Sequence, residues 1–268
     1  MTSPSAKYTH KLAGQRVLIF GGTSGIGFCV AEAALEHGAD LVISSSNQTK
    51  LDKTVARLKE TYPTETAKQT IITHVCDLSD VAHLDAHFEA LFQAATSGGT
   101  KKLNHVVTTA GDALQLPPLS DVTAAQFYAA ANVRCVAFAV MAKHLDKYLE
   151  KFPSSSFTLT SGLRGRKPAP GWSLMTSVCG AVEGLARGLA VDLKPIRVNV
   201  VSPGAVYTEM FEHFPKDQLE GVLQMFKEQS TTGTVARPED LAESYIYLMK
   251  DQFVTGSIIE SNGGALLV

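Results

Sequence analysis

The sequence lacks the cysteine and histidine spacing that metal sites and disulfide frameworks need. Its 268 residues include four cysteines, Cys29, Cys76, Cys135 and Cys179, and none of them forms a Cys-x-x-Cys pair. The eight histidines show no metal-ligand spacing either. We therefore expect no bound metal and reduced thiols in a reducing compartment, which we take to be the cytoplasm.

Charge of one sign and long apolar runs are also scarce. The formal net charge of -2 gives no signal for binding nucleic acid or an anionic membrane surface. The N-terminus is polar and lacks the apolar segment of a signal peptide, and the other apolar stretches are short and interrupted. The sequence therefore predicts neither a membrane span nor nucleic acid as a partner.

What the sequence does contain is a regular alternation of short apolar runs and helical patterns. The expected strands are 16–20, 40–44, 71–76, 104–109, 157–161, 197–202 and 257–260, and the expected helices are 25–36, 50–61, 121–151 and 172–193. Repeated β-α units with continuously apolar strands indicate a parallel sheet covered on both faces. Because no linker or repeat interrupts the pattern, residues 1–268 are predicted to form one α/β domain, with residues 1–13 as an N-terminal extension.

A glycine-rich segment follows the first expected strand. It reads F-G-G-T-S-G-I-G over Phe20–Gly27, and Gly21, Gly25 and Gly27 are spaced Gly-x-x-x-Gly-x-Gly. Glycines let backbone N–H groups approach a pyrophosphate, and the N-terminus of the next helix adds partial positive charge. The segment is predicted to bind a dinucleotide, and a strand and a helix on either side disfavour a plain tight turn. Thr23, Ser24 and Ile26 belong to the same predicted cofactor site.

The end of the second expected strand indicates which nicotinamide cofactor is bound. NAD-specific proteins place an acid there to bind the ribose 2′-hydroxyl, whereas this chain has Ser45, Ser46 and Asn47. Hydroxyl and amide groups can bind a 2′-phosphate and no acid repels it, so NADP(H) is favoured. The alternative is a polar loop without a discriminating role.

A longer segment points to a family. Ala181–Gly204 reads A-V-E-G-L-A-R-G-L-A-V-D-L-K-P-I-R-V-N-V-V-S-P-G, which together with the glycine spacing resembles the short-chain dehydrogenase/reductases from Gly14 to Gly264. Counting back without a gap places Met175 where the family has its catalytic Tyr and Cys179 where it has its Lys. The resemblance implies a Rossmann-type, doubly wound parallel sheet in a single domain. It also implies that the scaffold has lost its general acid.

The resemblance extends to other positions of the cofactor and active site. Asp77 matches an adenine-contacting Asp, although a helix-capping role is an equal alternative. Asn132 and Ser161 match the family's active-site Asn and Ser. The remaining cofactor-binding positions that the resemblance implies are Ala110, Gly111, Pro203, Gly204, Val206 and Thr208. Residues 207–233, with Phe211, Phe214, Leu219, Leu223 and Met225, match a region that forms a substrate lid in the family.

Two explanations of the missing Tyr remain open. In one, the protein is a catalytically inactive NADP-binding regulator or scaffold. In the other, its substrate needs no general acid: hydride addition to a carbonyl produces an alkoxide, whereas hydride addition to an iminium ion produces a neutral amine. The loss of the Lys also removes a cation from beside the nicotinamide, which suits a cationic substrate.

A finer resemblance favours the iminium. The segment Pro168–Trp172, P-A-P-G-W, and Arg134 two residues after Asn132 resemble fungal bifunctional reductase/Diels–Alderases of prenylated indole alkaloid biosynthesis. These proteins use NADPH to reduce a cyclic iminium, and an intramolecular [4+2] cycloaddition then builds a bicyclo[2.2.2]diazaoctane core. The family pattern has Asp where this chain has Ala169. Either this homologue manages without the carboxylate, or the sequence is an inactivated variant.

The resemblance assigns roles to a few side chains, each with an ordinary alternative. Arg134 is expected to bind a substrate carbonyl or the cofactor, or else to be a solvated helix-face residue. Trp172 is expected to stack on a prenylated indole substrate or close its pocket, or else to be core. Met175 and Cys179 are expected to line an apolar substrate pocket, or else to pack as core one helical turn apart.

Two further expectations concern the surface. Arg164, Arg166 and Lys167 are expected to form a solvated loop rather than a site. The long helices at 121–151 and 172–193 resemble the pair through which the family dimerises, so a homodimer or homotetramer is expected.

Overall fold

The computed structural model describes residues 6–114, 116–209, 211 and 215–268. Within these residues the chain forms one seven-stranded sheet in which every neighbouring pair of strands is parallel. The strands are β1 (Arg16–Phe20), β2 (Asp40–Ser45), β3 (Ile71–Val75), β4 (His105–Thr108), β5 (Ser156–Thr160), β6 (Arg197–Pro203) and β7 (Ile258–Ser261). The predicted single α/β domain with a doubly wound parallel sheet is therefore confirmed.

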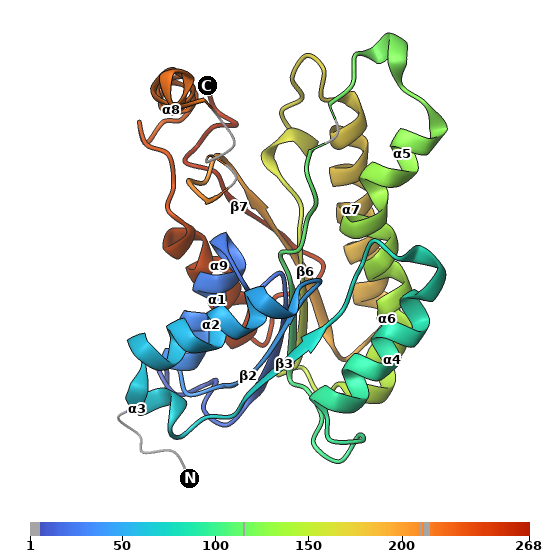
Figure 1. Cartoon of the computed structure of the whole chain (residues 1–268), viewed down its shortest axis with the longest axis vertical. Helices are drawn as coiled ribbons and strands as arrows, with labels where there is room; N and C mark the ends of the chain where they lie inside the picture. Colours follow the sequence, from blue (N-terminus) through green and yellow to red (C-terminus); the bar gives the residue numbers. More distant parts are fainter. Residues whose placement is uncertain (1–5, 115, 210, 212–214) are drawn as a thin grey trace.

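Helices cover both faces of the sheet (Figure 1). The α-helices are α1 (Gly25–Glu36), α2 (Gln48–Thr61), α3 (Pro63–Thr66), α4 (Leu84–Ala95), α5 (Ala124–Ala131), α6 (Ala137–Tyr148), α7 (Ser173–Asp192), α8 (Lys216–Glu228) and α9 (Pro238–Lys250). One buried cluster joins α1, α2 and α9 to one face of the sheet. A second cluster joins α4, α6 and α7 to the other face. These clusters leave the loops at the carboxyl ends of the strands free to form a site.

The strand order is β3-β2-β1-β4-β5-β6-β7. The chain winds outward from β1 through β2 to β3, and then crosses back to add β4 on the other side of β1. Ligands of open parallel sheets bind at such a reversal, beyond the carboxyl ends of the two central strands. Here those strands are β1, which leads into the glycine-rich segment, and β4, which leads into Ala110 and Gly111.

The long helix predicted over residues 121–151 is wrong as one continuous element. A capping box in which Thr123 and Gln126 bond each other's backbone N–H starts α5 at Ala124. A π-helical turn, Asn132–Val136, then separates α5 from α6. The apolar period cannot reveal the extra residue of a π turn, although such turns are frequent at functional sites. Most other predicted bounds differ by one or two residues, and no helix was predicted where α3, α4, α8 and α9 lie.

Two helical segments are long and apolar enough to cross a membrane by length and composition, Ala124–Tyr148 and Ser173–Asp192. The expectation that every apolar stretch is short and interrupted is therefore wrong for these two. Only 28% and 33% of their apolar windows are buried. Phe127 and Tyr128 on α5 and Val191 on α7 are exposed. The layer that contains α5 and α7 thus carries apolar surface that the described part of the chain does not cover.

Candidate active site

The glycine-rich segment packs tightly into the reversal point of the sheet. A Cβ atom on Gly21, whose φ is +81°, would lie 2.6 Å from the backbone nitrogen of Ala110. A Cβ on Gly27 would lie 2.3 Å from both the Gly21 carbonyl oxygen and Thr109 Oγ1. Thr109, in turn, donates its hydroxyl proton to the Phe20 carbonyl oxygen at 3.0 Å. Glycine is therefore required at both positions, because β1, α1 and the loop after β4 meet here.

The N-terminus of α1 favours an anion, and the Glu209 carboxylate approaches it, with Oε2 3.4 Å from the position that a Cβ on Gly25 would take. Within the described residues, the N-cap Ser24 of α1 makes no side-chain capping bond, and the first turn contains no acid. Uncapped N–H groups and the helix dipole together favour a negatively charged ligand. A nicotinamide dinucleotide fits this cradle through its pyrophosphate. The sequence assigned Gly25 and Ile26 to this same turn.

Two side chains predicted to contact the adenosine half have partners in the chain. Asn47 Oδ1 accepts the backbone N–H of Lys50 at 3.0 Å, so Asn47 caps α2. Asp77 Oδ1 accepts both the backbone N–H and the hydroxyl of Ser79, at 2.9 and 2.7 Å. These bonds lower the pKa of Asp77. Asp77 thus stabilises the turn that follows β3 and does not cap the next helix, which begins at Val81 with Asp80 as its N-cap residue. At the end of β2, Ser45 is half-buried and Ser46 is exposed.

The loop after β6 lies across the glycine-rich segment. Gly204 donates its N–H to the Ser261 carbonyl at 3.0 Å, and a Cβ on Gly204 would lie 2.8 Å from Asn262 Cα. Val206 forms a parallel bridge with Ala236. Thr208 then reaches the glycine-rich segment Phe20–Gly27, which we call the phosphate loop. Its Cγ2 lies 3.1 Å from the position that a Cβ on Gly25 would take. Pro203, Gly204, Val206 and Thr208 therefore follow one loop at the carboxyl edge of the sheet.

Arg134 is held on the loop after β4 and does not extend into solvent. It belongs to the π turn that starts at Asn132. Its Nη2 donates to the Asp112 carbonyl oxygen, and its Nε lies 3.4 Å from Asp112 Oδ1. The guanidinium lies against Gly111, where a Cβ would be 2.5 Å from Nη1. With its side chain only 22% exposed, the solvated alternative for Arg134 is wrong.

Asp112 is a member of this site that was not predicted from the sequence. It follows Gly111 directly, and nothing in its spacing distinguishes it from a loop residue. Among the described residues, both Asp112 Oδ1 and Arg134 Nε are buried without a hydrogen-bond partner. Burial lowers the pKa of Arg134, and the neighbouring Asp112 and Cys179 offset part of that effect. The pair thus places an incompletely satisfied carboxylate and guanidinium beside the reversal point of the sheet.

The positions of the missing Tyr and Lys differ from each other in environment. Met175 is 3% exposed and packs with Ala130, Leu174 and Val178. The core alternative therefore describes Met175 in this structure. Cys179 is half-buried, and burial raises the pKa of its thiol, so it is a neutral group near neutral pH.

A guanidinium partly restores the charge that the missing Lys removes. Arg134 lies close enough to Cys179 to oppose the rise of the pKa of its thiol. The loss of the Lys therefore removes one cation, while Arg134 remains as another in this part of the site. Because Asp112 pairs with Arg134, the positive charge is offset locally.

Ser161 is engaged within the chain. Its hydroxyl lies 3.3 Å from Oε1 of the buried Glu183 and 3.4 Å from the Cys179 carbonyl oxygen. Glu183 is also 3.7 Å from Arg166, which in turn lies 3.4 Å from Glu260. Ser161 is thus oriented by α7, which carries both Cys179 and Glu183.

A tight turn leads into α7 and presents the single tryptophan. The Ala169 carbonyl accepts the N–H of Trp172 at 3.0 Å, with Pro170 and a positive-φ Gly171 (+78°) between them. Pro followed by Gly is the chemistry of a type II turn. The Arg164 guanidinium carbon lies 5.3 Å from the centre of the Trp172 ring, which also packs against the cluster around Met175 on one side.

The basic loop before this turn is not simply solvated. Lys167 Nζ donates to the Ala265 carbonyl at 2.8 Å and to the main-chain oxygen of Val268. The expectation of a solvated loop is wrong for Arg164 and Lys167, which are half-buried, whereas Arg166 is exposed and lies near two carboxylates. These contacts tie the segment before α7 to the last residues of the chain.

The region predicted as a lid is partly described. Phe211 stacks on Tyr207 with ring centres 5.5 Å apart and meets Phe226 of α8 edge-on at 6.0 Å. Leu219, Leu223 and Met225 lie on α8, while Phe214 lies outside the described residues. Movement of this region stays a prediction.

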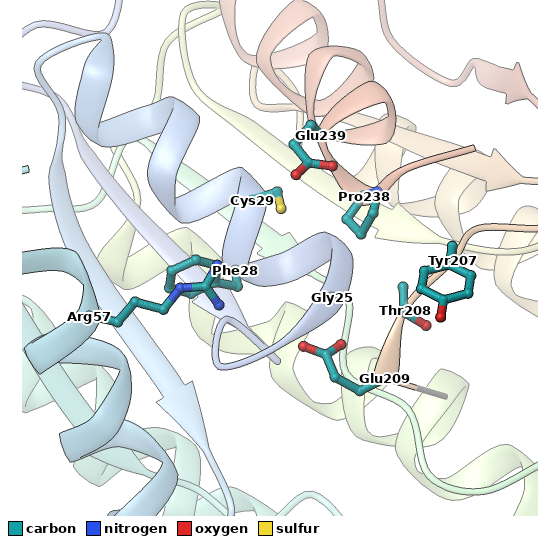
Figure 2. Close-up of a pocket in the computed structure, with 9 residues that line it drawn as sticks. All are labelled: Gly25, Phe28, Cys29, Arg57, Tyr207, Thr208, Glu209, Pro238 and Glu239. Atoms are coloured by element: carbon teal, nitrogen blue, oxygen red, sulfur yellow. The ribbon is translucent and has the colours of Figure 1, made fainter. Parts of the chain in front are cut away.

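Two adjoining cavities flank the N-terminal turn of α1. One, of about 250 Å³, is lined by Gly25, Phe28, Cys29, Arg57, Tyr207, Thr208, Glu209, Pro238 and Glu239 (Figure 2). The other, of about 380 Å³, is lined by Thr23, Ser24, Phe28, Lys50, Lys53, Thr54, Arg57 and Glu209. Both therefore open on the phosphate loop and on α2, and not on the cluster around Met175.

Comparisons with known proteins agree with this geometry. A model described as an SDR-like Rossmann domain matches residues 8–268. The short-chain dehydrogenase/reductase malC of the fungus Malbranchea aurantiaca is 47% identical over 99% of this chain and 99% of its own length. The structure of MalC reductase/Diels-Alderase from that organism has a TM-score of 0.91 and covers 98% of this chain and 99% of that one.

A more distant structure, a small-chain dehydrogenase in complex with NADPH, is 25% identical with a TM-score of 0.73. It covers 95% of this chain and 100% of that chain. A nicotinamide dinucleotide is therefore the cofactor that this fold and its phosphate loop fit. The family match spans nearly the whole chain, and the protein is a member of the short-chain dehydrogenase/reductase family.

Proposed function

We propose that this protein is an NADPH-dependent reductase of a cyclic iminium or imine, and that the same pocket guides an intramolecular [4+2] cycloaddition to a bicyclo[2.2.2]diazaoctane indole alkaloid. One observation carries the proposal. The phosphate loop is complete, whereas a buried Met175 and a neutral Cys179 stand where the family has its proton donor and its Lys. The likeness to a protein named as a reductase/Diels-Alderase supports both steps.

The charge of the substrate follows from this observation. When bound, the reduced nicotinamide supplies hydride. An iminium carbon that accepts hydride passes its C=N π electrons to nitrogen, so a neutral amine forms and no proton is needed. A ketone would instead require a proton for its alkoxide oxygen, and neither a thioether nor a high-pKa thiol is suited to give one.

The Arg134–Asp112 pair is the polar anchor of the proposed site. The Asp112 carboxylate faces Arg134 Nε with its buried Oδ1, while its side chain as a whole is 38% exposed, so its other oxygen can accept an N–H from a cationic substrate. Arg134 fixes the orientation of Asp112 and can donate to a substrate carbonyl. Asp112 then supplies a carboxylate to a chain that has Ala169 at the family's Asp position.

The cycloaddition needs shape more than charge. Its barrier falls mainly when diene and dienophile are held in one reactive pose. Trp172, which contacts Arg164 and packs against the cluster around Met175, is only half-buried, so the exposed part of its ring can contact a prenylated indole. An apolar wall with one polar anchor is sufficient for such a site.

The test is incubation with NADPH carrying deuterium at the transferred position and a cyclic iminium derived from a dipeptide. Deuterium at the former iminium carbon, together with a bicyclic product of one handedness, is the expected result. Deuterium without a bicyclic product would retain the reductase and discard the cycloaddition. No transfer from NADPH would favour a non-catalytic NADP-binding protein.

We further propose a homodimer or homotetramer as the working form, in the cytoplasm. The outer faces of α5 and α7 carry Phe127, Tyr128 and Val191 exposed on neighbouring helices. A second copy of this chain would cover that apolar surface. Light scattering with and without detergent separates this arrangement from membrane binding.

A further inference from the structure

The cavity between the phosphate loop and α2 is lined by three cationic side chains that have no role yet in binding the cofactor. Lys50, Lys53 and Arg57 line it from successive turns of α2, at spacings of three and four residues. Residues so spaced lie on one face of a helix. Thr23 and Ser24 of the phosphate loop line the same cavity of about 380 Å³.

These three cations are not neutralised by close ion pairs. No carboxylate of the described residues lies within 4.0 Å of any of their nitrogen atoms. Lys50 and Lys53 are exposed, and the Arg57 guanidinium lies 3.8 Å from the centre of the Phe28 ring. Glu209 is the acidic residue that lines the cavity, so cations exceed carboxylates along its wall (Figure 2 shows Glu209 directed towards Gly25).

The position of this face relative to the adenosine ribose decides what it binds. The 2′ substituent of the ribose is read at the end of β2, where this chain has Ser45 and Ser46 and no cation. Helix α2 begins two residues later, capped by Asn47, and Lys50 lies in its first turn. Its row of cations therefore starts at the carboxyl edge of the sheet, beside the loop that receives the pyrophosphate.

We infer that Lys50 and Lys53 of α2, with Thr23 and Ser24 of the phosphate loop, form the subsite that binds the 2′-phosphate of NADPH. The inference rests on the proposed use of NADPH and names the residues that would produce it. Serine hydroxyls at the end of β2 contribute hydrogen bonds, while the charge that distinguishes a phosphate from a hydroxyl comes from the helix. Lysine suits this task because its ammonium is a compact charge on a long stem.

The experiment compares two cofactors in Lys50→Ala, Lys53→Ala and the double variant by isothermal titration. Lys59→Ala is the matched control, because Lys59 lies on α2 but does not line the cavity. Each cavity variant is expected to raise the Kd for NADP⁺ about tenfold, roughly 1.4 kcal/mol, and to leave the Kd for NAD⁺ within about twofold. Lys59→Ala should change neither value.

A fragment isolates the phosphate itself. Adenosine 2′,5′-bisphosphate should lose affinity in the cavity variants as NADP⁺ does, whereas adenosine 5′-monophosphate should not. Equal weakening of NADP⁺ and NAD⁺ would assign the lysines to the pyrophosphate and overturn the inference. An NADP⁺ preference that survives in the double variant would overturn it while leaving the proposed function intact. Equal binding of both cofactors by the unmodified protein would overturn the NADPH assignment and this subsite together.

Discussion

Replacing Cys179 with Lys should destabilise the protein, although it restores the family residue. Arg134 already lies close enough to affect the Cys179 thiol, and Asp112 already pairs with that guanidinium. A second cation would therefore face Arg134 across a half-buried site. Gly165 adds a steric limit, since a Cβ at that position would lie 2.9 Å from Cys179 Cβ and the backbone there leaves little room to move.

The size of the effect follows from Coulomb's law. Two like charges on the order of 5 Å apart repel by about 3 kcal/mol at an effective dielectric constant of 20. Partial exposure and the offsetting Asp112 reduce this, so we expect Cys179→Lys to lower the free energy of unfolding by about 1–2 kcal/mol. Arg134→Met keeps the apolar stem without the charge and leaves Asp112 unpaired. In the double variant, the introduced lysine ammonium can pair with Asp112 instead.

The assay is a double-mutant cycle of urea unfolding for the wild type, Cys179→Lys, Arg134→Met and the double variant. The expected coupling free energy is about 1–2 kcal/mol in favour of the double variant, since each change relieves a defect of the other. Cys179→Met is the control for added volume without charge, and it should show no such coupling with Arg134→Met. Additivity within about 0.5 kcal/mol in the lysine cycle would refute the view that Arg134 occupies the electrostatic place of the missing Lys.

Three further outcomes are expected. Ala169→Asp should raise the rate of iminium reduction by about 5- to 150-fold, since one favourable electrostatic contact is worth roughly 1–3 kcal/mol, and an unchanged or lower single-turnover rate would contradict this. Light scattering without detergent should give a dimer or tetramer that Tyr128→Glu with Val191→Glu dissociates, whereas a monomer that requires detergent would favour membrane binding. The buried His105, whose pKa is lowered by burial from 6.5 to about 3, stays neutral when folded and binds a proton when unfolded. The free energy of unfolding should therefore fall by about 1.4 kcal/mol per pH unit as pH drops below about 6.5, and urea titrations should show a shallower pH dependence in His105→Gln.

The fold could be predicted from the sequence because each of its determinants is local. The apolar strands and the apolar faces of the helices recur at regular spacings in the sequence. The Phe20–Gly27 turn has its own glycine spacing. The π turn at Asn132–Val136 could not be predicted, because one extra residue in a helix leaves the apolar pattern nearly unchanged. Its consequence is large, since it places Arg134 over Gly111.

The site was less predictable than the fold for a related reason. Met175 and Cys179 could be matched to the family's Tyr and Lys because they lie on a helix, in which the spacing to the Ala181–Gly204 segment is preserved. Asp112 lies on a loop, and its importance comes from a contact with Arg134 that is 22 residues away in the chain. Lys50 and Lys53 likewise read as an ordinary solvated helix face until α2 is placed beside the phosphate loop.

The arrangement of charges in the site supports the proposed preference for a cationic substrate over a ketone. The Arg134–Asp112 pair carries almost no net charge, and the thiol of Cys179 is neutral because burial raises its pKa. A reaction that creates an alkoxide would place a new negative charge beside Asp112 without a proton donor. A reaction that discharges an iminium ends with all groups neutral or paired. Asp112→Asn should therefore weaken kcat/KM for an iminium by about 5- to 150-fold and leave NADP⁺ affinity unchanged, whereas an equal loss of NADP⁺ binding would place Asp112 on the cofactor.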